Sequence, residues 1–447
     1  MASTVDVAGE TSPDKVGVAA TPVTPAVVFE AWWPLAASWL LMGLEWPIVS
    51  AAIARLPAPT VSLAAFGGVV MPLSLVIEAP IIMLLAASTA LTRDLPSYRV
   101  GARFMWTSGL ALTAVHAAVA FTPLYVLIVG GLLRPPPEVR EPARLGLQIM
   151  TPWTMAIAYR RYQQGVLIRF GRSRAVSVGT AIRMVTIVGT LVTGALIGGV
   201  EGIVVGTLAT ALGVLAEAIY AGLAVGPLLK GPVREAPSPP GGPLTMARFI
   251  RFYLPLSLTP LFLFVVMPIA AAAMGRMPRP LESLAAWPAV NGLVLSVRST
   301  GFALNEVVVS LLDRPGAADV LWRFARKLGL ITSLLLLVLA ATPLGAGWFS
   351  VVAGLPPALV VLSSIALWLA LPIPAATALQ SYHQGAIVHA HATRHVTESV
   401  AILLVSTAAV LGAGVIWGGA PGLWVAMAGA AVGNVAKWAW LRHRTPR

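Results

Sequence analysis

The sequence contains no cysteine among its 447 residues, which excludes disulfides, thiol catalysis and cysteine-ligated metals. Charged residues are also scarce: they make up 11% of the chain, whereas a soluble domain carries roughly 25%. A chain with so few charges cannot cover a water-facing surface. Because 57% of the residues are hydrophobic, we expect an all-α polytopic membrane protein whose main solvent is lipid.

Acidic residues are outnumbered by basic ones, which leaves a net charge of +13. In a soluble protein this excess would suggest nucleic acid. Here the basic residues lie between apolar segments, so we interpret them as setting orientation in a membrane and expect no nucleic-acid partner. The GxxxxGK[ST], HExxH and GxSxG motifs are absent, so ATP hydrolysis and these enzyme activities are not expected. The expected partners are membrane lipids and a small-molecule substrate, with the chain acting as a monomer.

Apolar segments long enough to cross a bilayer recur along the chain. A spanning helix needs about 20 apolar residues. The sequence predicts twelve such helices, at residues 30–54, 61–90, 104–132, 145–168, 175–199, 202–228, 249–275, 283–312, 324–350, 355–388, 395–418 and 421–440. Residues 1–28 lack a basic region followed by a short apolar core and are interpreted as a disordered tail, not a signal peptide.

The connections between these helices alternate between basic and nearly neutral. One side collects the Lys and Arg residues at 93–103, 169–174, 230–251, 314–327, 394 and 437–447, which includes Lys437. The other side has six arginines, at positions 55, 134, 140, 144, 276 and 279. Because cytoplasmic loops carry the Lys/Arg excess, both termini are predicted to be cytoplasmic, in the plasma or inner membrane.

The chain repeats itself about 220 residues apart. The paired motifs are Pro34-Leu35 with Pro255-Leu256, Pro47 with Pro268, Arg55 with Arg276, Pro57 with Pro278, Pro59 with Pro280, 62–65 with 283–286, and 162–165 with 382–385. The Pro- and Gly-rich segment 229–248 is interpreted as a cytoplasmic linker between a unit at 29–228 and a unit at 249–447. Six helices in each unit predict two six-helix bundles related by an axis along the membrane normal, with a cleft between them.

Carboxylates within the predicted helices are candidate sites for a coupling ion, H+ or Na+. A charge near the bilayer centre costs at least roughly 2.5–3.5 kcal/mol, so each should face a cavity or a partner. Glu45 lies two residues before Pro47, where the first helix is expected to kink, and is either a protonation or cation switch or a structural partner of an arginine. Glu78, Glu217 and Glu306 are the other candidates.

Basic residues within the helices are candidate contacts for an anionic substrate. Arg160, Arg183 and Arg298 are the predicted anion contacts, because arginine matches carboxylate and phosphate geometry. The alternative for Arg160 and its neighbour Arg161 is that both extend to lipid phosphates at the cytoplasmic end. Arg298 aligns next to Glu78 in the repeat, so the two form either a gate between the bundles or two independent charges. The repeated Tyr-x-Gln-Gly motif adds Tyr162, Gln164, Tyr382 and Gln384 as predicted substrate-binding residues.

Histidines contribute one further cluster. His389, His391, His395 and Glu398 surround a predicted helix-loop-helix junction. A metal site needs converging ligands and a second shell, so we interpret the cluster as polar capping and expect no metal or other cofactor. His116 is interpreted as a buried histidine with satisfied hydrogen bonds.

The layout resembles the multidrug/oligosaccharidyl-lipid/polysaccharide (MOP) exporter superfamily, which includes the MATE transporters. The features that carry the likeness are the proline-bearing first helix with an acidic residue, the segment 62–67 and the segments 159–165 and 171–174. Within this group the chain is similar to the progressive ankylosis protein family at 33–35, 253–256 and 371–374.

The resemblance implies export of small molecules by alternating access. The ankylosis branch implies anions such as citrate, pyrophosphate or nucleotides, and the MATE branch implies cationic drugs exchanged for protons or sodium. Because the second copy has Val266 where the first has Glu45, and because arginines lie deep in the helices, we expect secondary-active export of a small organic or phosphate-containing anion. The alternatives are a cation/drug antiporter and a flippase for a lipid-linked substrate.

Overall fold

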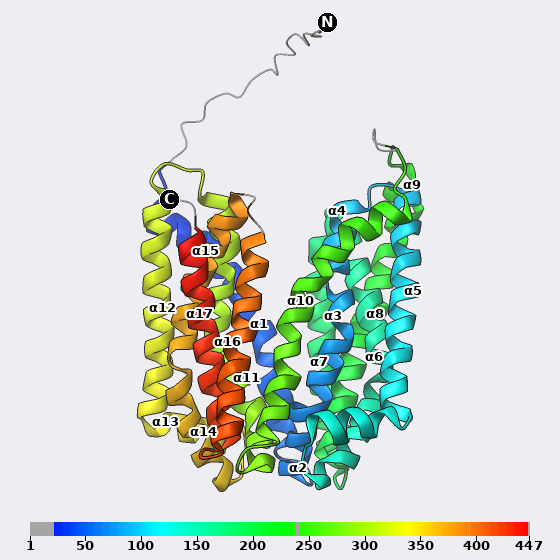
Figure 1. Ribbon diagram of the computed structural model, residues 1–447. Coiled ribbons are helices and arrows are strands. Elements are labelled where there is room, and N and C mark those ends of the chain that lie inside the picture. The colour runs from blue at the N-terminus through cyan, green and yellow to red at the C-terminus, as the bar shows by residue number, and fades with distance from the viewer. Residues whose placement is uncertain (1–21, 238–241, 391, 393, 446–447) are drawn as a thin grey trace, which may run out of the picture.

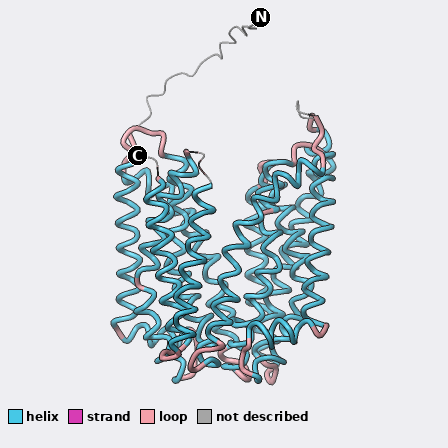
Figure 2. The backbone as a smooth tube through the Cα atoms, in the orientation of Figure 1, coloured by secondary structure: helices cyan, strands magenta, loops and turns pink. Residues whose placement is uncertain are grey.

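The computed structural model describes residues 22–237, 242–390, 392 and 394–445. Within these ranges every regular element is a helix and none is a strand (Figure 2). The elements are α1 (Pro25–Ile53), α2 (Pro59–Ala65), η1 (Phe66–Val70), α3 (Met71–Ile82), α4 (Leu84–Leu91), α5 (Leu95–Phe121), η2 (Val126–Leu133), α6 (Pro137–Arg169), α7 (Ser173–Ile197), α8 (Gly202–Lys230), α9 (Pro232–Glu235), α10 (Met246–Met274), α11 (Pro280–Leu311), α12 (Ala317–Ala341), α13 (Pro343–Gly347), η3 (Trp348–Val352), α14 (Pro357–Ala370), α15 (Pro372–His389), α16 (Arg394–Trp417) and α17 (Gly422–Arg444), where η marks a π-helix. Residues 1–21 of the predicted tail, 238–241 of the predicted linker and His391 lie outside the described residues.

Ten helices or runs of consecutive helices in the described part of the chain are long and apolar enough to cross a membrane. The chain is therefore a polytopic, all-helical membrane protein. Helices α6 and α17 are long enough, but they are not among the helices that are also apolar enough. The count of twelve spans stays a prediction.

Several helix boundaries differ from those predicted. Helix α1 begins at Pro25, after Thr24 caps its first turn, so the last residues of the predicted tail are helical. Helix α5 begins at Leu95 instead of residue 104, because Asp94 and Ser97 form a capping box in a stretch that hydropathy alone assigned to a loop. The predicted helix 104–132 is interrupted after Phe121, and η2 follows as a separate element.

The sequence repeat is also a structural repeat. The amide of Gly202, which opens α8, donates to the carbonyl of Pro57 at 3.2 Å, and the amide of Gly422, which opens α17, donates to the carbonyl of Pro278 at the same distance. The residue after each of these prolines has a left-handed backbone, with φ 53° at Ala58 and 55° at Arg279. The two halves thus turn the chain in the same way at equivalent positions.

Figure 1 shows two groups of helices that diverge toward the end of the molecule where the described chain termini lie. Helices α1 and α10 lie between the groups. The first half of α1 packs on the second group: Trp32 Nε1 donates to the Thr300 carbonyl at 2.9 Å, and its ring lies 5.5 Å from that of Phe324. The end of α1 reaches the first group, where Ile53 packs against Gly202 of α8.

Helix α10 also contacts both groups, in the opposite order to α1. Its first half packs on the first group, where Phe249 lies 4.9 Å from the ring of Phe104 and the Tyr253 hydroxyl donates to the carbonyl of Pro80. Its last residue, Met274, packs against Gly422 of α17 in the second group. The division into units at 29–228 and 249–447 stays a prediction. In the packed structure, α1 and α10 each contact one group of helices with their first half and the other group with their end.

The two ends of the molecule differ in charge. The end that holds the termini, called here the open end, carries the basic connections that include Arg93, Arg172 and Arg314. The opposite end, called here the closed end, carries the connections that include Arg55 and Arg276. The first and last described residues lie at the open end, and the assignment of both termini to the cytoplasm stays a prediction.

Candidate functional site

A cavity of 470 Å³ lies between α1, α10 and α11, and residues of α3, α16 and α17 complete its wall. Because α11 begins at the closed end, the cavity extends from the level of Trp287 toward the open end at Phe302. The wall is strongly apolar, and five aromatic side chains line it: Trp39, Trp46, Phe264, Trp287 and Phe302. Its size suits a drug-sized ligand.

Arg298, on α11, is the charged residue in the cavity wall. Its Nη2 donates to Asn434 Oδ1 at 3.1 Å, and its guanidinium lies 5.2 Å from the ring centroid of Phe302. Its Nε is buried and has no hydrogen-bond partner, and no acidic side chain among the described residues lies within 4.0 Å of it. The cavity therefore presents a positive charge that the protein itself does not neutralise.

Lys437 is a second unpaired cation, one turn beyond Asn434 on α17. Lys437 was predicted to lie near the end of the helix 421–440 on the cytoplasmic side; it lies within α17 and is partly buried, and its place on the cytoplasmic side stays a prediction. It makes no ion pair with the described acidic residues. Gln380 connects to the same region, since its Nε2 donates to the Asn434 carbonyl at 2.6 Å.

The repeat contained the signal for Lys437. Gly202 and Gly422 open equivalent helices, so Glu217 and Lys437 occupy the same position in the two copies. The first copy therefore places a carboxylate where the second places an ammonium. Comparing the sixth helices of the two units residue by residue would have identified this reversal of charge.

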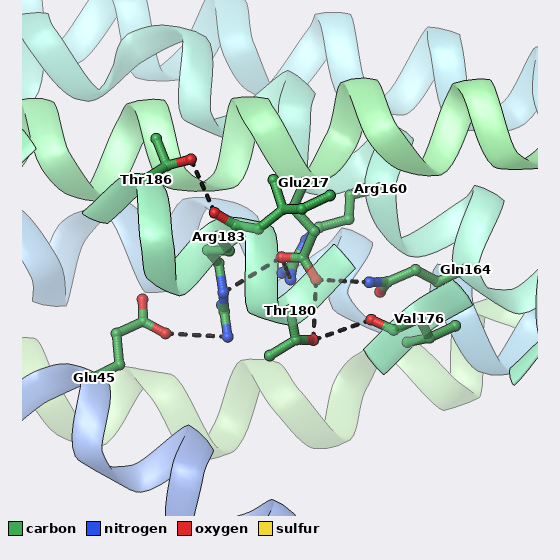
Figure 3. Close-up of polar contacts among 9 residues, drawn as sticks. Glu45, Arg160, Gln164, Val176, Thr180, Arg183, Thr186 and Glu217 are labelled. Atoms are coloured by element: carbon green, nitrogen blue, oxygen red, sulfur yellow. Dashed lines mark hydrogen bonds and ion pairs between the residues drawn. The ribbon is translucent and has the colours of Figure 1, made fainter. Parts of the chain in front are cut away.

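Glu217 lies at the centre of a polar network in the first group of helices (Figure 3). Its side chain is fully buried, and Oε2 accepts a hydrogen bond from Arg160 Nη1 at 2.5 Å. Oε1 accepts from Gln164 Nε2 at 2.9 Å and from the Thr180 hydroxyl at 3.3 Å. Arg183 Nε lies 3.4 Å from Oε2. The donors satisfy both oxygens of this buried carboxylate, which makes Glu217 a structural element of the first group of helices.

The same network neutralises two of the predicted anion contacts. Arg160 pairs with Glu217, and Arg183 pairs with both Glu217 and Glu45. Two cations and two carboxylates therefore balance each other in the first half of the chain. Neither arginine lines the 470 Å³ cavity, so of the three predicted anion contacts only Arg298 faces it.

Glu45 lies at the edge of this network and close to the cavity. Its Oε2 is 3.1 Å from Arg183 Nη2, and its side chain is 15% exposed, whereas that of Glu217 is fully buried. The neighbouring residues Gly43 and Trp46 line the cavity. Glu45 is therefore the carboxylate of the network that solvent or an ion reaches most easily.

The remaining predicted coupling residues form no hydrogen bond or ion pair with the described residues of this network. Glu78 is buried on α3, and one of its carboxylate oxygens has no hydrogen-bond partner. No ion pair within the described residues joins Glu78 to Arg298, so the predicted gate is not formed in this conformation. Glu306 is exposed on α11 and makes no ion pair with another described residue.

The repeated Tyr-x-Gln-Gly motifs do not reach the cavity. Tyr162 is buried and donates to the carbonyl of Tyr98 at 2.7 Å, while Gln164 is used by the Glu217 network. The rings of Tyr382 and Trp322 pack at a tilted angle with centroids 5.1 Å apart, and Gln384 is half-buried on the helix of Tyr382, α15. The motif packs helices together, which explains its presence in both copies.

The histidines form no shared site within the described residues. His389 pairs with Asp313 at 2.9 Å, and His395 pairs with Glu398 at 2.9 Å, whereas His391 is not described. No group of three potential metal ligands exists in the part of the chain that the structure covers. His116 is buried between the Thr154 hydroxyl and the Leu147 carbonyl.

Two equivalent arginines join the helix groups at the closed end. Arg55, at the end of α1, donates from Nη2 to the carbonyls of Val351 and Val352 at 2.5 and 2.9 Å. Arg276, at the end of α10, donates to the carbonyls of Leu132 and Leu133 at 2.6 and 3.2 Å. Each arginine thus binds the carbonyl end of a π-helix in the opposite half, where unpaired carbonyls and the helix dipole favour a cation.

We predict that these two clamps hold the closed end shut. Arg55→Ala with Arg276→Ala removes four charge-assisted hydrogen bonds between the halves, each worth about 1.5–3 kcal/mol. The closed end should then open in a measurable fraction of molecules. Spin labels on cysteines at Leu127 and Leu344, exposed on η2 and α13 of opposite halves, would report a new, longer distance.

The absence of native cysteine makes this labelling specific. The matched control is Arg279→Ala, which removes a closed-end arginine bound only to a residue on its own helix. The control should keep the distance distribution of the parent protein. A double variant that also keeps it would show that the clamps contribute nothing to closure.

No protein-family model matches the chain, and no curated protein matches it. Solved structures do. A multidrug resistance MATE family transporter of the MOP superfamily, in an inward-facing conformation, is 15% identical over 92% of this chain and 98% of its own, with a TM-score of 0.66. The lipid II flippase MurJ, in an inward closed conformation, is 13% identical over 92% and 86%, with a TM-score of 0.67. A MOP superfamily transporter from Pyrococcus furiosus is 14% identical over 95% and 96%, with a TM-score of 0.59. The chain has the fold of these proteins.

Proposed function

We propose that the protein is a secondary-active transporter that exports a small organic or phosphate-containing anion by alternating access. The single observation that carries the proposal is the unequal charge of the two halves. In the first half, Arg160 and Arg183 are neutralised by Glu217 and Glu45. In the second half, Arg298 faces the cavity without a described acidic partner.

The physical argument rests on the cost of burying charge. An unpaired buried cation is expensive, and replacing it with an apolar residue would stabilise the helices. Arg298 and Lys437 lie on neighbouring helices, α11 and α17, so each also repels the other. A substrate anion that enters the cavity would neutralise this charge, so we infer that the two cations bind substrate.

The fold supports movement between two states. The cavity lies between two groups of helices that diverge at the open end, and two equivalent arginines join them at the other. If the basic connections face the cytoplasm, the conformation described is inward-facing, as is that of the similar MATE transporter. Binding of the anion and release of the clamps would then expose the cavity to the opposite side.

Uptake into proteoliposomes tests the proposed function directly. A panel of labelled anions and of cations of similar size would be assayed under separate pH and sodium gradients. The proposal expects uptake of at least one anion, in keeping with the resemblance to the progressive ankylosis protein family. Uptake of cations alone would favour the MATE-type antiporter, and transfer of a lipid-linked substrate without uptake of free anions would favour a flippase like MurJ.

We also predict that Glu45 couples transport to the ion gradient. Glu45→Gln preserves the size of the side chain and a hydrogen-bond acceptor for Arg183, but it cannot gain or lose a proton. Substrate binding should stay within about threefold of the parent, whereas stimulation of uptake by a proton or sodium gradient should disappear. Stimulation that persists in Glu45→Gln would exclude Glu45 as the coupling residue.

A further inference from the structure

The cavity wall offers very few free hydrogen-bonding groups. Besides the indole N–H groups of Trp39, Trp46 and Trp287, its polar side chains are Asn291, Arg298, Ser299, Thr407 and Asn434. Three of these already satisfy one another or the backbone: Ser299 donates to the Ser296 carbonyl at 2.8 Å, Thr407 to the Gly429 carbonyl at 3.2 Å, and the Asn434 amide to the Ala430 carbonyl at 2.8 Å. Arg298, Asn291 and the tryptophan indole groups are therefore left for a ligand, and Arg298 is the charged one among them.

The rest of the wall is aromatic and aliphatic, and it surrounds Arg298 from two sides. Trp39 and Phe302 form a pair with ring centroids 5.3 Å apart, and Phe302 also lies under the guanidinium. On the opposing helix, α10, Phe264 and Val266 face the same space. An anion with many polar groups would lose hydration here without replacement, which costs free energy for each unpaired group.

We infer that the transported anion is amphipathic, with one carboxylate or phosphate headgroup and an apolar body. This inference rests on the proposed function and names its substrate class. The headgroup binds Arg298, with Lys437 adding positive charge, and the body fills the apolar part of the 470 Å³ cavity between α1 and α10. Small hydrophilic anions such as citrate and pyrophosphate are then poor ligands.

Isothermal titration with the full chain in nanodiscs tests this inference. The probes are methyl, butyl and hexyl phosphate, with citrate, pyrophosphate and hexyltrimethylammonium for comparison. Burial of one methylene group is worth about 0.8 kcal/mol, which corresponds to about a fourfold gain in affinity. The dissociation constant should therefore fall about fourfold for each added methylene, and empty nanodiscs provide the correction for partitioning into lipid.

A wall variant separates the apolar site from the charge. Phe264→Ser, at a half-buried position, should weaken hexyl phosphate about tenfold while leaving methyl phosphate unchanged. Binding that does not depend on chain length, or citrate and pyrophosphate binding more tightly than hexyl phosphate, would overturn the inference but leave the proposed function standing. Binding of hexyltrimethylammonium without any alkyl phosphate would overturn both.

Discussion

Arg298→Gln combined with Lys437→Gln is expected to weaken hexyl phosphate binding by roughly 100-fold and to abolish its uptake into proteoliposomes. A hydrogen bond to a charged group contributes about 1.5–3 kcal/mol, and the double variant removes both cations from the cavity region. The folded protein should be at least as stable as the parent, because the change relieves repulsion between two unpaired buried charges. Titration in nanodiscs and thermal unfolding measure the two effects on one preparation.

A control variant tests whether the position of the two removed cations matters. Arg323→Gln with Arg326→Gln also removes two cations, but these lie exposed on α12, away from the cavity. This control should bind hexyl phosphate as the parent does. If it lost binding to the same extent as the double variant, net charge of the chain would explain the result and the cavity assignment would be wrong.

Glu217→Gln is expected to destabilise the protein by about 3–5 kcal/mol, because it leaves buried arginine charge without its carboxylate. Heat and SDS unfolding in the same lipid would show the loss as a lower midpoint and a reduced yield of folded protein. The exposed carboxylate Glu306, changed to Gln, is the matched control and should shift stability by less than about 0.5 kcal/mol.

A second substitution should reverse most of this loss. The second copy has Gln380 at the position of Arg160 and no carboxylate at the position of Glu217, so Arg160→Gln with Glu217→Gln removes both members of the buried ion pair, as the second copy does. Arg183 then keeps Glu45 as its partner at 3.1 Å. The double variant should recover more than half of the lost stability. If the stability losses of the two single variants add up in the double variant, Arg160 and Glu217 do not depend on each other.

Much of the fold could be predicted because its signals are local. The helices follow from long apolar segments, and the duplication follows from prolines and an arginine in one register, which the equivalent contacts of Gly202 and Gly422 reproduce. The exchange of α1 and α10 between the two groups was not predicted. Aliphatic helix faces pack equally well against either group, so the sequence carries no local signal for it.

The site was harder to predict because charge pairing depends on how helices rotate against each other. Arg183 and Glu45 lie far apart in sequence on α7 and α1, and only the packed structure shows that they neutralise each other. The burial of Lys437 near Arg298 was not predicted, because hydropathy gives the extent of a helix and not which of its side chains turn inward. Arg298 lines the cavity, which agrees with the expectation that an arginine deep in an apolar helix faces a cavity or a partner, and its role as an anion contact stays a prediction.

The central claim is that the second half of the chain carries an anion site where the first half carries balanced ion pairs. The most direct measurement compares dissociation constants for hexyl phosphate and hexyltrimethylammonium in the parent and in Arg298→Gln with Lys437→Glu. The variant introduces at 437 the carboxylate that the first copy has at Glu217. The parent should prefer the phosphate and the variant the ammonium. A parent that prefers the ammonium, or a variant that keeps the parent's preference for phosphate, would contradict the account.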